Sequence, residues 1–198
     1  MVETITGSQA IESIGKEIYG EKFSIEDTDK KSVYKDVYNS FTKNNKGKAK
    51  KGICLVGGLG VGKSAMMKVF HKLFRNSNSR FRWVSGYELK DLSEMLTIQQ
   101  IKEMYGYELK CDLYIDDIGI SVDVKRYGNT VNIITEILME RYDLFIETGF
   151  KTHISSNLPT VMKGINTPTI NSVYGNRVYD RIKEMCEVII FKGESQRK

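Results

Sequence analysis

A glycine-rich stretch at residues 57–64, GGLGVGKS, has the residue types and spacing of a loop that binds phosphate. It matches the pattern G-x-x-x-x-G-K-[ST] at every fixed position, with an apolar segment before it and a helical pattern after it. In such a loop, backbone N–H groups and a helix N-terminus surround phosphate oxygens. We therefore expect Lys63 to reach the β- and γ-phosphates of ATP and Ser64 to bind Mg²⁺ through its hydroxyl. The predicted nucleotide-binding residues of this loop are Gly57, Gly58, Leu59, Gly60, Val61, Gly62, Lys63, Ser64 and Ala65.

Two adjacent carboxylates follow the apolar segment 113–115, where a strand should end. Two such charges side by side are costly unless they are solvated or paired with a cation. Given the phosphate-binding loop, we expect Asp116 to contact Mg²⁺, directly or through water. Asp117 could then act as the general base that polarises the attacking water. An acid-rich turn without a chemical role is the alternative.

A polar residue also ends the next apolar segment, where THISSNLP runs from a strand into a loop. Asn157 is well placed there to hold the attacking water opposite Asp117, although asparagine before Leu-Pro is equally ordinary in a loop. We expect His153 to be a packed strand residue rather than a catalytic one.

Two arginines four residues apart, Arg177 and Arg181, share one face of a predicted helix. An arginine delivered to a γ-phosphate, in cis or from a neighbouring subunit, stabilises charge in the transition state. A solvated helix face with local pairing to Asp180 and Glu184 is the alternative.

The elements that must position these residues form an alternating pattern. Apolar segments at 53–56, 81–85, 113–116, 151–155 and 188–191 predict five strands, and periodic segments at 63–74, 85–96, 131–144 and 171–185 predict the helices between them. Ser85 and Glu88 form a plausible capping box. This pattern predicts an α/β domain with a five-stranded, mostly parallel sheet covered on both faces.

A shorter section precedes this domain. Helical spacing at 8–19 and 29–42 predicts two helices, separated by a short extended piece that contains Phe23 and Ile25. Residues 43–51 hold five lysines and no acid and are typical of a solvated connector. We therefore divide the chain into a short N-terminal helical segment with a basic linker, residues 1–50, and the α/β domain, residues 51–198.

Composition excludes several classes of protein. The 198 residues are 40% hydrophobic and 28% charged, which is typical of a globular domain and excludes disorder as the dominant state. No apolar run reaches membrane-spanning length, and the N-terminus does not have the pattern of a signal peptide. The cysteines Cys54, Cys111 and Cys186 are odd in number and widely spaced, so we expect buried thiols in a reducing compartment and a cytoplasmic protein.

Several motifs together resemble the AAA+ ATPases of the DnaC helicase-loader and IstB transposition-helper type. They are, in chain order, GGLGVGKS, FRWVSGYELKDL, CDLYIDDIG, ILMERY, THISSNLP, YGNRVYDRI and GESQR, and they cover roughly residues 50–197. The resemblance implies a P-loop three-layer sandwich. The sequence departs from most AAA+ proteins in one respect, because it ends soon after the fifth predicted strand and we therefore expect the helical lid to be lacking. It also implies that Asn157 is the first sensor of the γ-phosphate, that Arg181 is the arginine finger and that Arg197 is the second sensor at the nucleotide. Arg177 matches a motif position without an assigned role.

The resemblance further implies an ATPase that acts in DNA replication, as helicase loaders do, or in mobile-element DNA transactions. Such proteins assemble with ATP into open rings or spirals and engage single-stranded DNA, a replicative helicase or a transposition protein. The section before the P-loop helps to wall the adenine, which points to Phe23 and Ile25. Candidate DNA contacts are Lys43–Lys51, Lys90, Lys102, Lys125 and Arg126, with charge kept for solubility as the alternative, since the net charge is only +5.

Two other functions remain open at this point. A small-molecule P-loop kinase would need a second substrate pocket and a closing lid, and the sequence shows no separate lid insertion. A nucleotide-bound scaffold with negligible turnover would act by ATP-dependent assembly alone. The paired acids followed by Asn157 favour hydrolysis by water over transfer to a second substrate.

Overall fold

The computed structural model describes residues 6–26, 28–42, 51–120, 122–126, 129–161, 167–193 and 195. Within them, a five-stranded sheet has the order β2-β3-β6-β1-β7, and each neighbouring pair is parallel. Its strands are β1 (Gly52–Val56), β2 (Phe81–Ser85), β3 (Asp112–Asp116), β6 (Thr152–Ser156) and β7 (Cys186–Ile190). Every strand of the predicted sheet is therefore confirmed. The first and last residues of the strands differ from the predicted ones by no more than two positions.

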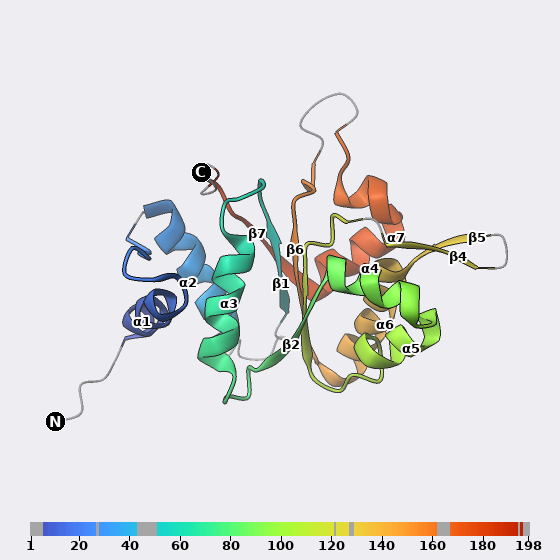
Figure 1. The fold of residues 1–198 in the computed structure, drawn as a ribbon, viewed down its shortest axis with the longest axis horizontal. Helices are drawn as coiled ribbons and strands as arrows, with labels where there is room; N and C mark the ends of the chain where they lie inside the picture. Colours follow the sequence, from blue (N-terminus) through green and yellow to red (C-terminus); the bar gives the residue numbers. More distant parts are fainter. Residues whose placement is uncertain are drawn as a thin grey trace.

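Helices cover both faces of this sheet (Figure 1). One face carries α1 (Gly7–Tyr19), α2 (Thr28–Thr42) and α3 (Lys63–Phe74), and the other carries α4 (Gly86–Met95), α5 (Ile98–Tyr105), α6 (Ile133–Thr148) and α7 (Ile170–Met185). Because successive strand residues point to opposite faces, Ile53 and Leu55 join the core on the first face, and Cys54 and Val56 join the core on the second. The predicted three-layer sandwich is confirmed.

The two N-terminal helices share a core with the sheet. Ile11 of α1 and Val37 of α2 are buried in the same cluster as Phe70 of α3. Phe41 stacks against Phe70 and Phe74 at centroid distances of 5.8 and 4.8 Å. These contacts fix α1 and α2 beside the helix that begins at the glycine-rich loop.

Three local features differ from the prediction. The helix expected at 131–144 begins at Ile133, because residues 129–132 form β5 (Asn129–Asn132), which pairs antiparallel with β4 (Asp123–Arg126) in a projecting hairpin (Figure 1). The helix predicted at 85–96 is confirmed as α4, but a further helix, α5, follows it and starts at its own capping box on Thr97. The helix at 171–185 is kinked at Gly175, whose φ is +81°.

At residue 85 the expected helix start is confirmed, since the Ser85 side chain accepts the N–H of Glu88. The described residues after β7, Phe191–Gly193 and Ser195, contain no helix. Among the described helices, none combines the length and apolar character needed to cross a membrane. The thiols of Cys54, Cys111 and Cys186 are free.

Candidate nucleotide-binding site

The glycine-rich loop connects the end of β1 at Val56 to the start of α3 at Lys63. Gly60 and Gly62 have φ values of +77° and +105°, a left-handed region that residues with a Cβ rarely adopt. Gly62 is the N-cap of α3 and has no side chain to accept the first N–H groups of the helix. The loop therefore has the backbone of an anion-binding turn at a helix N-terminus.

Lys63 lies at the centre of this loop and is only 7% exposed. Its ammonium donates to the carbonyl oxygens of Gly57 and Gly58, both at 2.8 Å, and to Asn157 Oδ1 at 2.6 Å. The structure thus brings the loop lysine and Asn157, which are far apart in the sequence, into direct contact.

Asp116 ends β3 opposite the first turn of α3. The Ser64 hydroxyl donates to Asp116 Oδ1 at 2.8 Å. A hydroxyl and a carboxylate are hard oxygen ligands, and Mg²⁺ is commonly held by one or two such protein groups together with phosphates and water. Among the described residues, no three His, Cys, Asp or Glu side chains form a metal cluster of their own. Ser64 and Asp116 therefore fit a Mg²⁺ ion that binds together with a nucleotide.

Asp117 has a strained backbone, with a φ of +56° in the left-handed region. Its Oδ1 accepts the Asn157 amide at 2.9 Å, so Asn157 joins Asp117 to Lys63. Burial raises the pKa of the Asp117 carboxyl, and the neighbouring charge of Asp116 raises it further, while Lys63 acts in the opposite direction. Strain and a shifted pKa in a cleft are typical of a general base.

Lys63, Ser64, Asp117 and Asn157 line a cavity of about 340 Å³. A second cavity of about 430 Å³ shares Gly62 and Ala65 with it. The second cavity has aromatic walls, which are Tyr19, Phe23, Tyr34 and Phe191. The first cavity, called the phosphate cavity below, lies at the glycine-rich loop and suits the phosphates of a nucleotide. The adjoining aromatic cavity suits its base. Phe23 lies at this wall as expected, whereas Ile25 is buried in the core and does not line it.

Arg177 and Arg181 do not line these cavities. Arg181 rests on α6, with its guanidinium 4.5 Å from the Tyr142 ring and Nη1 3.7 Å from Asp143. Arg177 is exposed. Arg197 lies outside the described residues. Ser195 packs against Gly60, where an added Cβ would collide with the serine hydroxyl oxygen, so Ser195 lies beside the glycine-rich loop.

Three residues at the site were not predicted. Tyr114 and Ser155 both donate to Asp116 Oδ1 at 2.7 Å, and the exposed Tyr87 lines the phosphate cavity. Two of them could have been predicted from the sequence, because residues two apart on a strand point to the same face as each other. Tyr114 precedes Asp116 by two, and Ser155 precedes Asn157 by two. His153 is buried and stacks on Phe41 at 4.7 Å, as expected of a packed residue.

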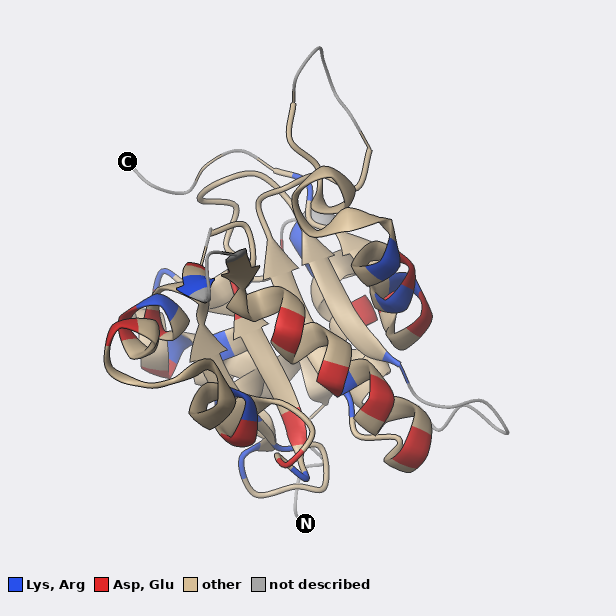
Figure 2. Cartoon of the chain, turned by 90° about the vertical axis from the view of Figure 1, so that its right-hand side faces the viewer, with Lys and Arg blue, Asp and Glu red and all other residues tan. Residues whose placement is uncertain are grey.

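The candidate DNA contacts differ in their surroundings. Lys102 forms ion pairs with Glu136 at 3.4 Å and Glu140 at 2.9 Å, and the helices on this side of the molecule carry many acidic residues (Figure 2). Its charge is therefore compensated within the chain. Lys90 and Lys125 are exposed, whereas residues 43–50 and the side chain of Arg126 lie outside what the structure describes.

No family model matches the sequence, and no curated protein is similar to it. Solved structures do share the fold. DnaI aligns with a TM-score of 0.60 and 15% identity, over 89% of this chain and 88% of that chain. The DnaC helicase loader aligns with a TM-score of 0.54 and 17% identity, over 87% of this chain and 95% of that chain. AMPPCP-bound DnaA from Aquifex aeolicus aligns with 0.60 and 12% over 89% of this chain and 51% of that one. The loop and the sheet order define a P-loop NTPase fold. Within that class the fold is AAA+ and DnaC-like, as the motifs predicted.

Proposed function

We propose that the chain binds ATP with Mg²⁺ and hydrolyses the ATP to ADP and phosphate. The observation that carries this proposal is the network at the carboxyl ends of β1, β3 and β6. There Lys63 contacts Asn157, Asn157 contacts Asp117, and Ser64 contacts Asp116. The similarity of the fold to that of DnaA bound to an ATP analogue supports the same conclusion.

Each residue then has a distinct task. Lys63 exchanges loop carbonyls for the β- and γ-phosphates, and Ser64 and Asp116 hold Mg²⁺, which neutralises charge on those phosphates. Asp117 accepts a proton from the attacking water, and Asn157 orients that water beside the γ-phosphate. The second, aromatic cavity holds the base.

The active form is an assembly, in which Arg181 of one subunit completes the site of the next and Arg197 acts at the nucleotide. The partners are single-stranded DNA and a replicative helicase or transposition protein, in DNA replication or in mobile-element transactions. The similarity in fold to the DnaC helicase loader supports this role. In this assembly Arg181 would exchange its contacts with Met139, Tyr142 and Asp143 on α6 for the nucleotide of the neighbouring subunit.

Phosphate release per subunit, measured over a range of protein concentrations, tests this proposal. We expect the specific activity to rise with concentration, to rise more steeply with single-stranded DNA, and to lose both effects in Arg181→Ala. Arg177→Ala is the matched control, because Arg177 is the exposed arginine one turn earlier on the same helix. Flat specific activity that DNA does not change would contradict assembly, and phosphate transfer that needs an added acceptor would favour a kinase.

A further inference from the structure

Ser155 lies on β6, two residues before Asn157, at the wall of the phosphate cavity. Its side chain is buried, and its hydroxyl makes two hydrogen bonds to consecutive residues of a different strand end. It donates to Asp116 Oδ1 at 2.7 Å and accepts the backbone N–H of Asp117 at 2.9 Å. One hydroxyl thus contacts both members of the acidic pair.

The bond to Asp116 determines how that carboxylate is oriented. Asp116 Oδ1 accepts three hydroxyls, from Ser64, Tyr114 and Ser155. Ser64 is the hydroxyl assigned to Mg²⁺, so its bond to Asp116 is replaced when the ion binds. Tyr114 and Ser155 are then the groups that keep the carboxylate turned toward the metal, a role that outer hydrogen-bond partners commonly have at metal sites.

The bond to Asp117 supports its strained backbone. A φ of +56° is costly for a residue that has a Cβ and persists only where surrounding contacts enforce it. Ser155 supplies two such contacts, because its hydroxyl accepts the Asp117 N–H and its carbonyl accepts the Ile118 N–H at 2.9 Å. The backbone conformation in turn aims the Asp117 side chain at Asn157.

We infer that Ser155 is a positioning residue that fixes the metal-binding and the proton-accepting carboxylates relative to each other. This inference rests on the proposed function, since it assigns the two carboxylates the roles given above. In this role Ser155 acts through its hydrogen bonds to Asp116 and Asp117.

The test compares Ser155→Ala with Ser156→Ala. Ser156 is the next residue of the same strand and is equally buried, but its hydroxyl accepts the N–H of Leu158, outside the acidic pair. Affinity for a fluorescent ATP analogue is measured in EDTA and across a Mg²⁺ titration, together with turnover and the thermal unfolding midpoint. Ser155→Cys, with a side chain of similar size and a weak donor, replaces the alanine variant if that variant does not fold.

For Ser155→Ala we expect unchanged affinity in EDTA, a Mg²⁺ requirement about tenfold higher and turnover about tenfold lower. Ser156→Ala should match the wild type in all three. The inference is overturned if the two variants have the same Mg²⁺ requirement and the same turnover, because Ser155 would then be only a packed residue. If the wild-type chain binds nucleotide without hydrolysing it, the proposed function fails, yet the Mg²⁺ titration of nucleotide affinity still decides the role of Ser155.

Discussion

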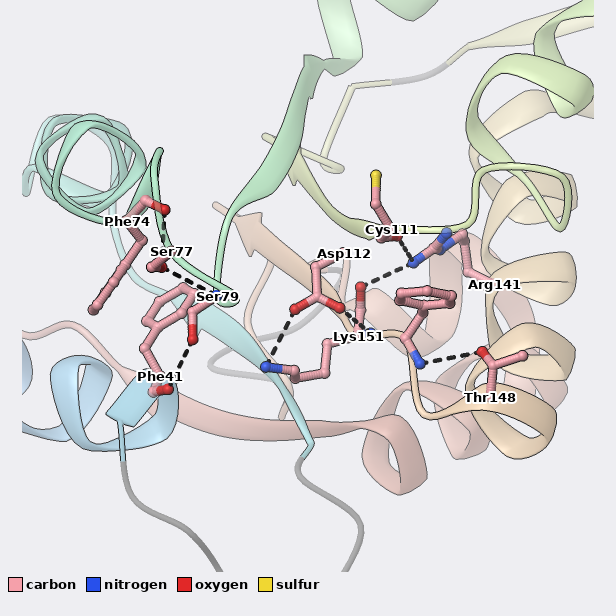
Figure 3. Close-up of polar contacts among 10 residues, drawn as sticks. Phe41, Phe74, Ser77, Ser79, Cys111, Asp112, Arg141, Thr148 and Lys151 are labelled. Atoms are coloured by element: carbon pink, nitrogen blue, oxygen red, sulfur yellow. Dashed lines mark hydrogen bonds and ion pairs between the residues drawn. The ribbon is translucent and has the colours of Figure 1, made fainter.

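Strands β3 and β6 carry a polar cluster at each end, and the two clusters are built differently. The amino-end cluster consists of Asp112, Arg141 and Lys151, which Figure 3 shows, together with Thr152. The carboxyl-end cluster consists of Lys63, Asp116, Asp117, Ser155 and Asn157. Both contain charges of each sign, and four residues of the second cluster, Lys63, Asp117, Ser155 and Asn157, line a cavity.

The amino-end cluster is closed and its groups are paired. Arg141 has no exposed surface and donates to Thr152 Oγ1 and to the carbonyls of Leu109, Cys111 and Lys151, at 2.8–2.9 Å. Burial lowers its pKa to about 10, a value at which it is still charged at neutral pH. Asp112 pairs with both the ammonium and the N–H of Lys151 (Figure 3). Such a cluster ties the loops before β3 and β6 to α6.

The carboxyl-end cluster has features that cost stability. Asp117 has a left-handed backbone, and burial together with Asp116 raises the pKa of its carboxyl. Strain and unfavourable charge are common where a fold has been adapted to chemistry. The comparison therefore assigns stability to the amino ends and chemistry to the carboxyl ends of the same two strands.

The largest effect should come from Arg141→Met. It removes four hydrogen bonds that a charged group donates to the Thr152 hydroxyl and to three carbonyls, of which Leu109 and Lys151 keep a backbone donor. We expect a loss of about 3–5 kcal/mol in the free energy of unfolding. Urea unfolding measures this loss. Arg181→Met is the matched control, because that arginine is partly exposed and should contribute less than about 1 kcal/mol. Equal losses in the two variants would show that the amino-end cluster has no special stabilising role.

Asp117→Asn, in contrast to Arg141→Met, should lower turnover without lowering the free energy of unfolding. Loss of the proton acceptor should lower turnover at least about 100-fold, while nucleotide affinity is retained. Asparagine tolerates the left-handed backbone and removes the repulsion from Asp116, so the free energy of unfolding should stay the same or rise. Phosphate release and urea unfolding on the same samples check both points. A variant that loses stability and keeps its turnover would reverse the comparison.

Asp112→Asn should have an intermediate effect on stability and little effect on nucleotide affinity. It removes the charge partner of the Lys151 ammonium but leaves an oxygen for the Lys151 N–H. We expect a loss of about 2 kcal/mol in urea unfolding. A fluorescent ATP analogue should bind the variant as it binds the wild type, and a large drop in affinity would mean that the two clusters are coupled.

The smallest effect concerns pH. In the folded chain the pKa of the Asp117 carboxyl lies above its ordinary value of 3.8. At a pH between 3.8 and the raised pKa, the folded state therefore binds more protons than the unfolded state. This contribution to stability therefore falls as pH rises from 3.8 through the raised pKa. Unfolding measured in EDTA should show the wild type losing stability relative to Asp117→Asn across that window. A constant difference between the two would contradict the raised pKa.

The sequence predicted the sheet, most of its helices and four residues of the carboxyl-end cluster, because these depend on local patterns. The four residues are Lys63, Asp116, Asp117 and Asn157. The loop motif and the acids after Ile115 are fixed by spacing along the chain. The β4–β5 hairpin was missed because Val131 continues the apolar periodicity of α6. The pairing of Val131 with Val124 on the other strand cannot be read from that periodicity. The roles of Arg141 and Ser155 depend on contacts with β3 and the loop before it, which no local pattern encodes.

A Mg²⁺–ATP site at the carboxyl ends of β1, β3 and β6 can be tested by titrating the wild type and Lys63→Ala with a fluorescent ATP analogue in Mg²⁺. We expect saturable binding to the wild type and at least about tenfold weaker binding to a Lys63→Ala chain that unfolds at the same urea concentration. Equal affinity in the two proteins would contradict the proposed site.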